Sequence, residues 1–118
     1  MINVIEPKGN SSLCITGAGA VGLGALMALK LIPARPEEVI VVDIVPERLR
    51  LAEKYGATVT INSLEVKDLA AALSHATKGR GVDGSIDTTG RPDVVASLFK
   101  AAAKKGSVVQ VGVGSVSC

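Results

Sequence analysis

Three glycines at a fixed spacing are the first residues of this sequence that could do chemistry. Gly17, Gly19 and Gly22 form the pattern G-x-G-x-x-G, directly after the apolar run from Leu13 to Ile15. In such a strand-to-helix turn the first glycine permits the tight bend, the second lets a pyrophosphate approach the backbone, and the third lets the helix lie close to the strand. The N–H groups and the positive end of the helix dipole then face the anion. The motif predicts a phosphate-binding loop, and by itself it also fits an ordinary glycine-rich turn.

A carboxylate further along the chain favours the dinucleotide interpretation. Glu38 to Val42 reads as a buried strand, and Asp43 ends it. In a parallel sheet that strand end lies beside the adenosine ribose, where a carboxylate accepts hydrogen bonds from the hydroxyls. The same charge repels the extra phosphate of NADP by about 4 kcal/mol, for two unit charges roughly 4 Å apart at an effective dielectric near 20. We therefore expect the chain to bind NAD in preference to NADP, although Arg48 could offset part of the repulsion. Without the glycine motif upstream, Asp43 would be interpreted as an ordinary turn residue before Pro46.

Composition limits the fold to a single aliphatic domain. The chain has 118 residues, of which 47% are hydrophobic, with one Phe, one Tyr and no Trp. A core built from Val, Ile, Leu and Ala suits strands that are buried on both faces of a parallel sheet. The net charge of +2 is small and the basic residues are scattered, so nucleic acid is not expected as a partner.

The cysteines and the hydropathy of the chain exclude other classes of site. Cys14 and Cys118 have no Cys or His at ligand spacing, so we expect a buried thiol and a free terminal thiol, with no metal site. Residues 1–12 are polar and do not resemble a signal peptide. The apolar run 18–29 is too short and too rich in glycine to span a bilayer. A cytoplasmic protein without a membrane partner is expected.

Turn signals between apolar segments predict an alternating series of strands and helices. The first helix is apolar on nearly every face, so it should lie between the sheet and something else. Ser63 is expected to cap the third helix, and Lys104 and Lys105 should lie in the last turn of the fourth. His75, the only histidine, is expected at the surface. The expected helices span about residues 20–32, 46–56, 63–79 and 92–106, and the expected strands about 13–16, 38–43, 57–61, 81–87 and 107–111.

This series specifies an α/β fold, a doubly wound parallel sheet of the Rossmann type with five strands in the order 3-2-1-4-5. A ligand crevice should open at the switch between strands 1 and 4. Loops 17–22, 43–48, 88–91 and 111–114 would line it, because they follow the carboxyl ends of the strands. We expect residues 1–11 to be a lead-in and residues 12–118 to be the dinucleotide-binding domain. This domain lacks the sixth strand of the fold, so we expect it to be a fragment of a larger enzyme.

Several short motifs in this order resemble one family. The set is similar to the coenzyme domain of zinc-dependent medium-chain alcohol dehydrogenases over about residues 12 to 114. Its aryl-alcohol (benzyl alcohol) branch is the most similar, on Asp43-Ile44-Val45 with Arg48-Leu49 and on Thr89-Gly90-Arg91-Pro92. The motifs are Gly17-Ala18-Gly19-Ala20-Val21-Gly22, Val41-Val42-Asp43-Ile44-Val45, Arg48-Leu49, Leu51-Ala52, Tyr55-Gly56-Ala57-Thr58, Asp87-Thr88-Thr89-Gly90-Arg91-Pro92 and Val111-Gly112-Val113.

The resemblance implies a role for each matching position. The glycine loop would hold the pyrophosphate, Asp43 and Arg48 the adenosine ribose, and the backbone at Val111 and Val113 the nicotinamide end. In the family, hydride passes to the nicotinamide from an alkoxide that zinc activates as a Lewis acid. The cofactor-binding residues implied in this way are Gly17, Gly19, Ala20, Val21, Gly22, Asp43, Ile44, Arg48, Thr88, Thr89, Gly90, Arg91, Val111, Gly112 and Val113.

The sequence also departs from the family. The zinc ligands of the family belong to a separate catalytic domain, and this sequence has no matching set of cysteines and histidines. Asp87 stands where a glutamate is more usual. We therefore expect a chain that binds NAD and is inactive alone, within a parent enzyme that oxidises an alcohol. The expected partners are the dinucleotide, the missing catalytic domain and, through the unpaired edge of the sheet, a second copy of the chain.

Two other classes of dinucleotide or nucleoside binder remain as alternatives. A stand-alone regulatory sensor, of the kind that gates ion transporters, has a similar length and glycine loop, but its third strand ends in a Gly-Asp pair, whereas this one ends near Asn62. A methyltransferase would carry an acidic residue before the glycine loop, where this chain has Ile15 and Thr16. Both differences favour the dehydrogenase domain.

Overall fold

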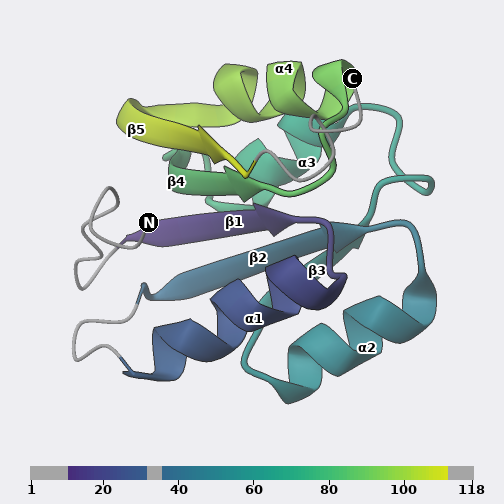
Figure 1. The fold of residues 1–118 in the computed structure, drawn as a ribbon. Coiled ribbons are helices and arrows are strands. Elements are labelled where there is room, and N and C mark those ends of the chain that lie inside the picture. The colour runs from purple at the N-terminus through teal and green to yellow at the C-terminus, as the bar shows by residue number, and fades with distance from the viewer. Residues whose placement is uncertain (1–10, 32–35, 112–118) are drawn as a thin grey trace.

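Five parallel strands form one sheet, in the order β3-β2-β1-β4-β5, with helices on both faces (Figure 1). The structure is a computed structural model that describes residues 11–31 and 36–111. The expected doubly wound fold and strand order are confirmed. The strands are β1 (Ser12–Thr16), β2 (Glu38–Asp43), β3 (Val59–Asn62), β4 (Val82–Asp87) and β5 (Ala102–Gln110). The helices are α1 (Ala20–Ala28), the short 3-10 helix η2 (Leu29–Leu31), α2 (Pro46–Lys54), α3 (Leu69–Ala76) and α4 (Pro92–Ala101).

Alternation along the central strands builds two hydrophobic cores. Leu13 and Ile15 of β1 face α1 and α2, where they pack with Leu26 and Leu49. Cys14, between them, faces the opposite layer formed by α3 and α4. Successive side chains of a strand point to opposite faces, so a run that is apolar throughout is covered on both sides. The aliphatic composition therefore gives a three-layer domain.

Strand register brings the carboxyl ends of the central strands together. Thr16 pairs with Val42 of β2 on one side and with Asp87 of β4 on the other. Asp43 at the end of β2 pairs with Asn62 of β3. The loops that leave these ends all emerge at one edge of the sheet, beside the switch between β1 and β4.

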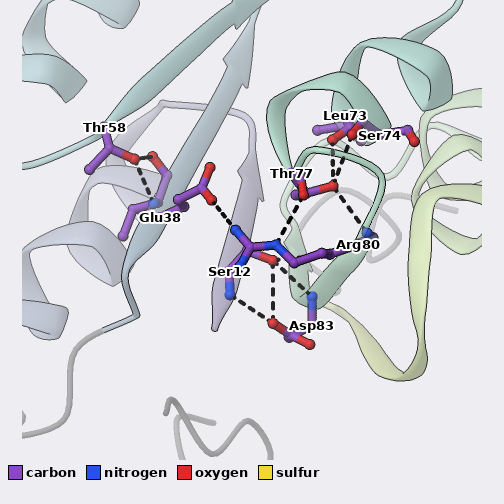
Figure 2. Close-up of polar contacts among 10 residues, drawn as sticks. Ser12, Glu38, Thr58, Leu73, Ser74, Thr77, Arg80 and Asp83 are labelled. Carbon is purple, nitrogen blue, oxygen red and sulfur yellow. Dashed lines mark hydrogen bonds and ion pairs between the residues drawn. The ribbon is translucent and has the colours of Figure 1, made fainter. Parts of the chain in front are cut away.

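Polar contacts tie together the opposite ends of the same strands (Figure 2). The Ser12 backbone N–H of β1 donates to Asp83 Oδ2 of β4 at 2.9 Å, and the Asp83 N–H donates to Ser12 Oγ at 3.2 Å. Arg80 Nη2 lies 2.9 Å from Glu38 Oε1 at the start of β2. These contacts link the amino ends of β1, β2 and β4, at the edge of the sheet opposite to the loops described above.

Two element boundaries differ from the expectation. The third helix begins at Leu69, with the Asp68 side chain accepting from the Ala71 N–H at 3.1 Å, so Asp68 and not Ser63 is its cap. The fourth helix ends at Ala101, and Lys104 and Lys105 lie in β5, because pairing with β4 begins at Ala102. The pairing shifts register between Val82 and Gly84, which admits the extra residues of β5.

The first helix packs on the sheet through Leu26 and exposes its other side. Its exposed apolar side chains include Val21 at 40%, Met27 at 48% and Leu31, in the following turn, at 85%. The covering layer expected over this side is therefore not supplied by the described residues. None of the helices in residues 11–31 and 36–111 has the length and apolar character needed to cross a bilayer.

Candidate functional site

Two of the three glycines are required by the protein's own packing. Gly17 has a φ of +89°, and a Cβ there would collide with Thr88 Oγ1. A Cβ on Gly22 would collide with the carbonyl oxygen of Gly17. Residue 17 therefore makes the turn off β1, and residue 22 lets α1 lie against that turn, as the motif predicts.

Gly19 is different because the space in front of it is empty. A Cβ built there has no described atom closer than Arg48 Nη1, at 3.9 Å. Gly19 is the N-cap of α1, with no side-chain cap and no acidic residue in the first turn. The start of the helix, where the positive end of its dipole lies, thus faces an open space that suits an anion.

Asp43 connects the end of β2 to the glycine loop. Its buried carboxylate accepts from the Ala18 N–H at 2.6 Å through Oδ2. Its Oδ1 accepts from the N–H groups of Ile44 at 2.6 Å and Val45 at 3.0 Å. Arg48 Nη1 lies 3.9 Å from Oδ2, with its side chain half exposed. Three accepted bonds leave about one acceptor position of the carboxylate for a ligand in the crevice.

The loop after β4 forms the opposite wall. Thr88 Oγ1 donates to the carbonyl oxygens of Thr16 at 2.8 Å and Gly17 at 3.1 Å. Asp87, fully buried at the end of β4, accepts from Thr16 Oγ1 at 2.6 Å and from the N–H of Gly90 at 3.0 Å. The glycine loop and residues 88–91 are therefore held to each other directly.

These walls enclose a cavity of about 270 Å³ at the switch between β1 and β4. Eight of the predicted residues line it: Gly17, Gly19, Asp43, Ile44, Arg48, Thr88, Thr89 and Arg91. Five other predicted residues are described by the structure and do not line the cavity: Ala20, Val21, Gly22, Gly90 and Val111. Gly112 and Val113 lie outside the described residues.

The family model of zinc-binding dehydrogenases matches residues 20–117. This chain belongs to the zinc-binding dehydrogenase family. The resemblance drawn from the motifs is confirmed.

Individual zinc-binding dehydrogenases match nearly the whole chain. Erythritol/L-threitol dehydrogenase of Mycolicibacterium smegmatis is 35% identical over 102 residues, which are 86% of this chain and 27% of that protein. Alcohol dehydrogenase 1 of Pisum sativum is 37% identical over 116 residues, which are 97% of this chain and 30% of that protein. The crystal structure of benzyl alcohol dehydrogenase from Acinetobacter calcoaceticus superposes with a TM-score of 0.83 at 37% identity, covering 93% of this chain and 29% of that one. The chain thus spans less than a third of the length of these relatives.

Four residues that line the cavity of this zinc-binding dehydrogenase domain were not predicted: Thr16, Val42, Ser63 and Val94. Thr16 and Val42 lie at the carboxyl ends of β1 and β2, a position that strand register alone indicates. Ser63 follows β3, and its N–H donates to the carbonyl oxygen of Asp43 at 3.2 Å. Because Ser63 was interpreted as a helix cap, its position on the cavity wall was not predicted.

The remaining titratable candidates lie away from the cavity. Burial raises the pKa of the Cys14 thiol to about 12, with a smaller contribution from the nearby Asp87 carboxylate. Cys14 is therefore the expected buried, protonated thiol. His75 is exposed in the last turn of α3, as expected. Within the described part of this family member, no group of three or more His, Cys, Asp and Glu side chains could hold a metal ion.

Proposed function

We propose that this chain is the NAD-binding domain of a zinc-dependent alcohol dehydrogenase and that its parent enzyme transfers hydride between an alcohol and NAD. One observation carries the proposal: the open space at Gly19 lies next to a buried carboxylate, Asp43, that has an acceptor position left. The first feature fits a diphosphate and the second fits a ribose diol. Family membership supports the parent activity.

Each part of the dinucleotide has a matching part of the cavity. The N–H groups at the start of α1 would bind the pyrophosphate, and Asp43 would accept from the ribose hydroxyls. Ile44, which is 44% exposed, and Val94 offer apolar surface to the adenine on the far side of the ribose. Arg48 and Arg91 supply positive charge at the rim. NAD, when bound, supplies the nicotinamide that accepts hydride.

The residues described here do not fit a zinc site, so the metal and the alcohol would be held by another part of the parent polypeptide. The lengths of the relatives support this division, because the chain matches less than a third of each. The similarity to a benzyl alcohol dehydrogenase supports an aryl alcohol as the substrate. The proposal retains a cytoplasmic location, with Cys14 as a buried free thiol.

The outer side of α1 supports a second domain as the partner. Val21, Met27 and Leu31 form an exposed apolar stripe on a helix whose described positions 20–29 contain no charged residue. The stripe leads away from the same helix end that faces the cavity.

Titration with NADH and NADPH tests the cofactor assignment. The chain has no Trp, so binding is followed by the enhancement of nicotinamide fluorescence. We expect saturable binding of NADH and at least about tenfold weaker binding of NADPH, from the charge of Asp43. A preference for NADPH would contradict the role of Asp43. Absence of binding for both nucleotides, in a chain shown to be folded by circular dichroism, would contradict the proposed function.

A further inference from the structure

Asp87 is a buried carboxylate without a cationic partner. Its side chain is 0% exposed, and none of the ion pairs among residues 11–31 and 36–111 includes it. A carboxylate in such a position is retained in a fold only when hydrogen-bond donors surround it. The donors that surround Asp87 therefore indicate what its charge holds in place.

All of the donors to Asp87 come from the two walls of the cavity. From the β1 wall, Thr16 Oγ1 donates to Oδ1 at 2.6 Å. From the loop wall, the N–H and Oγ1 of Thr89 donate to the same oxygen at 3.1 Å and 2.6 Å. The Gly90 N–H donates to Oδ2 at 3.0 Å. One side chain thus fixes both the end of the strand that precedes the glycine loop and the first residues of the opposite loop.

Asp87 itself does not line the cavity, whereas Thr16 and Thr89 do. We propose that Asp87 is the positioning residue of the cofactor cavity. Its hydrogen bonds hold the two walls that bind the dinucleotide at a fixed separation and keep the loop wall ordered, and Asp87 itself does not contact the dinucleotide. The inference rests on the proposed function for the identity of the ligand. The geometry that carries it is present without any ligand.

The chemistry requires a carboxylate and not an amide. Two of the four donors are backbone N–H groups, those of Thr89 and Gly90, which cannot accept a hydrogen bond. An asparagine would turn an NH2 group toward one of them and leave that half-buried N–H without its acceptor. The loop conformation and the residue type are therefore matched.

The same strand offers a matched control. Asp83, at the other end of β4, also joins β4 to β1, through the N–H of Ser12 (Figure 2). The variants Asp87→Asn and Asp83→Asn make the same chemical change in the same strand pair, one at the cavity and one at the opposite edge. Free energies of unfolding in urea report the stability that each variant loses.

The test compares NADH affinity and amide hydrogen exchange across the variants of the full chain. Asp87→Asn should raise the Kd for NADH about tenfold or more and speed exchange at Thr89 and Gly90. Asp83→Asn should leave the Kd within about twofold. An Asp87→Asn protein that binds NADH like the wild type would overturn the proposal, and so would an equal loss of affinity in both variants.

A second pair of variants covers the case in which Asp87→Asn does not fold. Thr16 itself lines the cavity, so these two variants are compared with each other. Thr16→Ser keeps the hydroxyl donor to Asp87, whereas Thr16→Val removes it and should bind NADH more weakly than Thr16→Ser and speed amide exchange at residues 89–90. Equal affinities and exchange rates in the two would overturn the proposal. If the folded wild type binds no NADH, the proposed function fails, and the exchange rates alone then decide whether Asp87 orders the two walls.

Discussion

The three glycines of the motif are the same residue type, but their surroundings in the structure differ. Gly17 and Gly22 are fixed by contacts inside the protein, with the hydroxyl of Thr88 and with the carbonyl of residue 17. Gly19 faces open space, so no contact among the described residues requires the absence of its side chain, whereas under the proposed function the pyrophosphate does. Substitution can therefore separate the folding role of the motif from its binding role.

The first prediction uses this difference. Gly19→Ala should change the free energy of unfolding by less than about 1 kcal/mol and abolish measurable NADH binding, because its methyl group occupies the path of the pyrophosphate. Gly22→Ala should destabilise the chain by about 1–3 kcal/mol or more through overpacking. Gly24→Ala, on the open side of the same helix, should be neutral or stabilising by about 1 kcal/mol and bind NADH normally. Urea unfolding and NADH titration of the three variants test this prediction. NADH binding that is retained in Gly19→Ala would refute the proposed pyrophosphate site at Gly19.

Asp43 carries the prediction on cofactor choice. Asp43→Ser removes the charge that repels the phosphate of NADP, so the ratio of the Kd for NADPH to the Kd for NADH should fall by about tenfold or more. NADH should also bind more weakly, because the N–H of Ala18 loses its acceptor. Glu47→Ser, at an exposed carboxylate in the first turn of α2, should leave the ratio unchanged. An unchanged ratio in Asp43→Ser would argue against the discriminating role of this carboxylate.

The buried thiol gives a prediction on pH dependence. The unfolded Cys14 thiol ionises near pH 9.0, whereas burial keeps the folded thiol protonated up to a pKa of about 12. Above pH 9 the unfolded state binds fewer protons, so the stabilisation present below that pH is lost as pH rises toward 12, by about 1 kcal/mol at pH 10. In a Cys118→Ser background, urea unfolding should show this loss relative to Cys14→Ala. Rapid reaction of the native Cys14 with Ellman's reagent at pH 8 would contradict it.

At the level of the elements, local sequence signals predicted the central part of each helix and strand, whereas tertiary pairing determined where each one begins and ends. Leu69, Ala70 and Leu73 are buried with the helical spacing that the sequence indicates, but the N-cap of α3 is Asp68 and not Ser63. Both residues are good N-caps, and local chemistry does not choose between them. The choice follows from β3, whose turn takes Ser63 to the cavity wall.

At the start of the fifth strand, local sequence signals and tertiary pairing again indicate different boundaries. Lysines near the end of a helix favour its dipole, and lysines also protect the edge of a sheet from pairing with other chains. Lys104 and Lys105 fit either description. They belong to the strand because they lie between Ala102 and Ser107, the residues that pair with β4 on either side of the register shift. Since β5 is the last strand in the sheet order, its outer edge is the proposed contact for a second copy.

Dimer formation through this edge is the prediction that belongs to β5. We expect light scattering to show a dimer mass that dissociates on dilution. Gln110→Lys, which adds a third cation on the exposed part of the strand, should weaken the dimer, whereas Ala71→Lys, at an exposed position of α3, should not. A monomer mass at all concentrations would remove the second copy from the list of partners.

At the scale of the whole molecule, the proposed function makes the cavity one half of an active site. The described residues offer a dinucleotide cradle and an apolar stripe on α1, and they offer no group of side chains for a metal. Under the proposed function, this domain supplies the cofactor site, and chemistry on the alcohol would require the rest of the parent enzyme.

The last prediction follows from that division. The purified chain, with NAD, zinc and benzyl alcohol, should produce no NADH above the rate of a protein-free control, because no side-chain set holds the metal-bound alkoxide next to the nicotinamide. Absorbance at the NADH band is the measurement. Turnover that scales with protein concentration and disappears in Gly19→Ala would show that the domain is active without a partner.

The sequence by itself determined the features that depend on residue type and short spacing. These are the glycine turn, the carboxylate at the end of the second strand, the aliphatic strands buried on both faces, and the alternation that fixes the strand order. Each depends on local sterics or on the periodicity of one element, which are properties of neighbours along the chain. Tertiary structure alone decided that Asp87 joins the two cavity walls, that Ser63 lines the cavity, and that β5 begins at Ala102. Those contacts link residues as many as 71 positions apart, and the free energy that fixes them arises only when the strands pair.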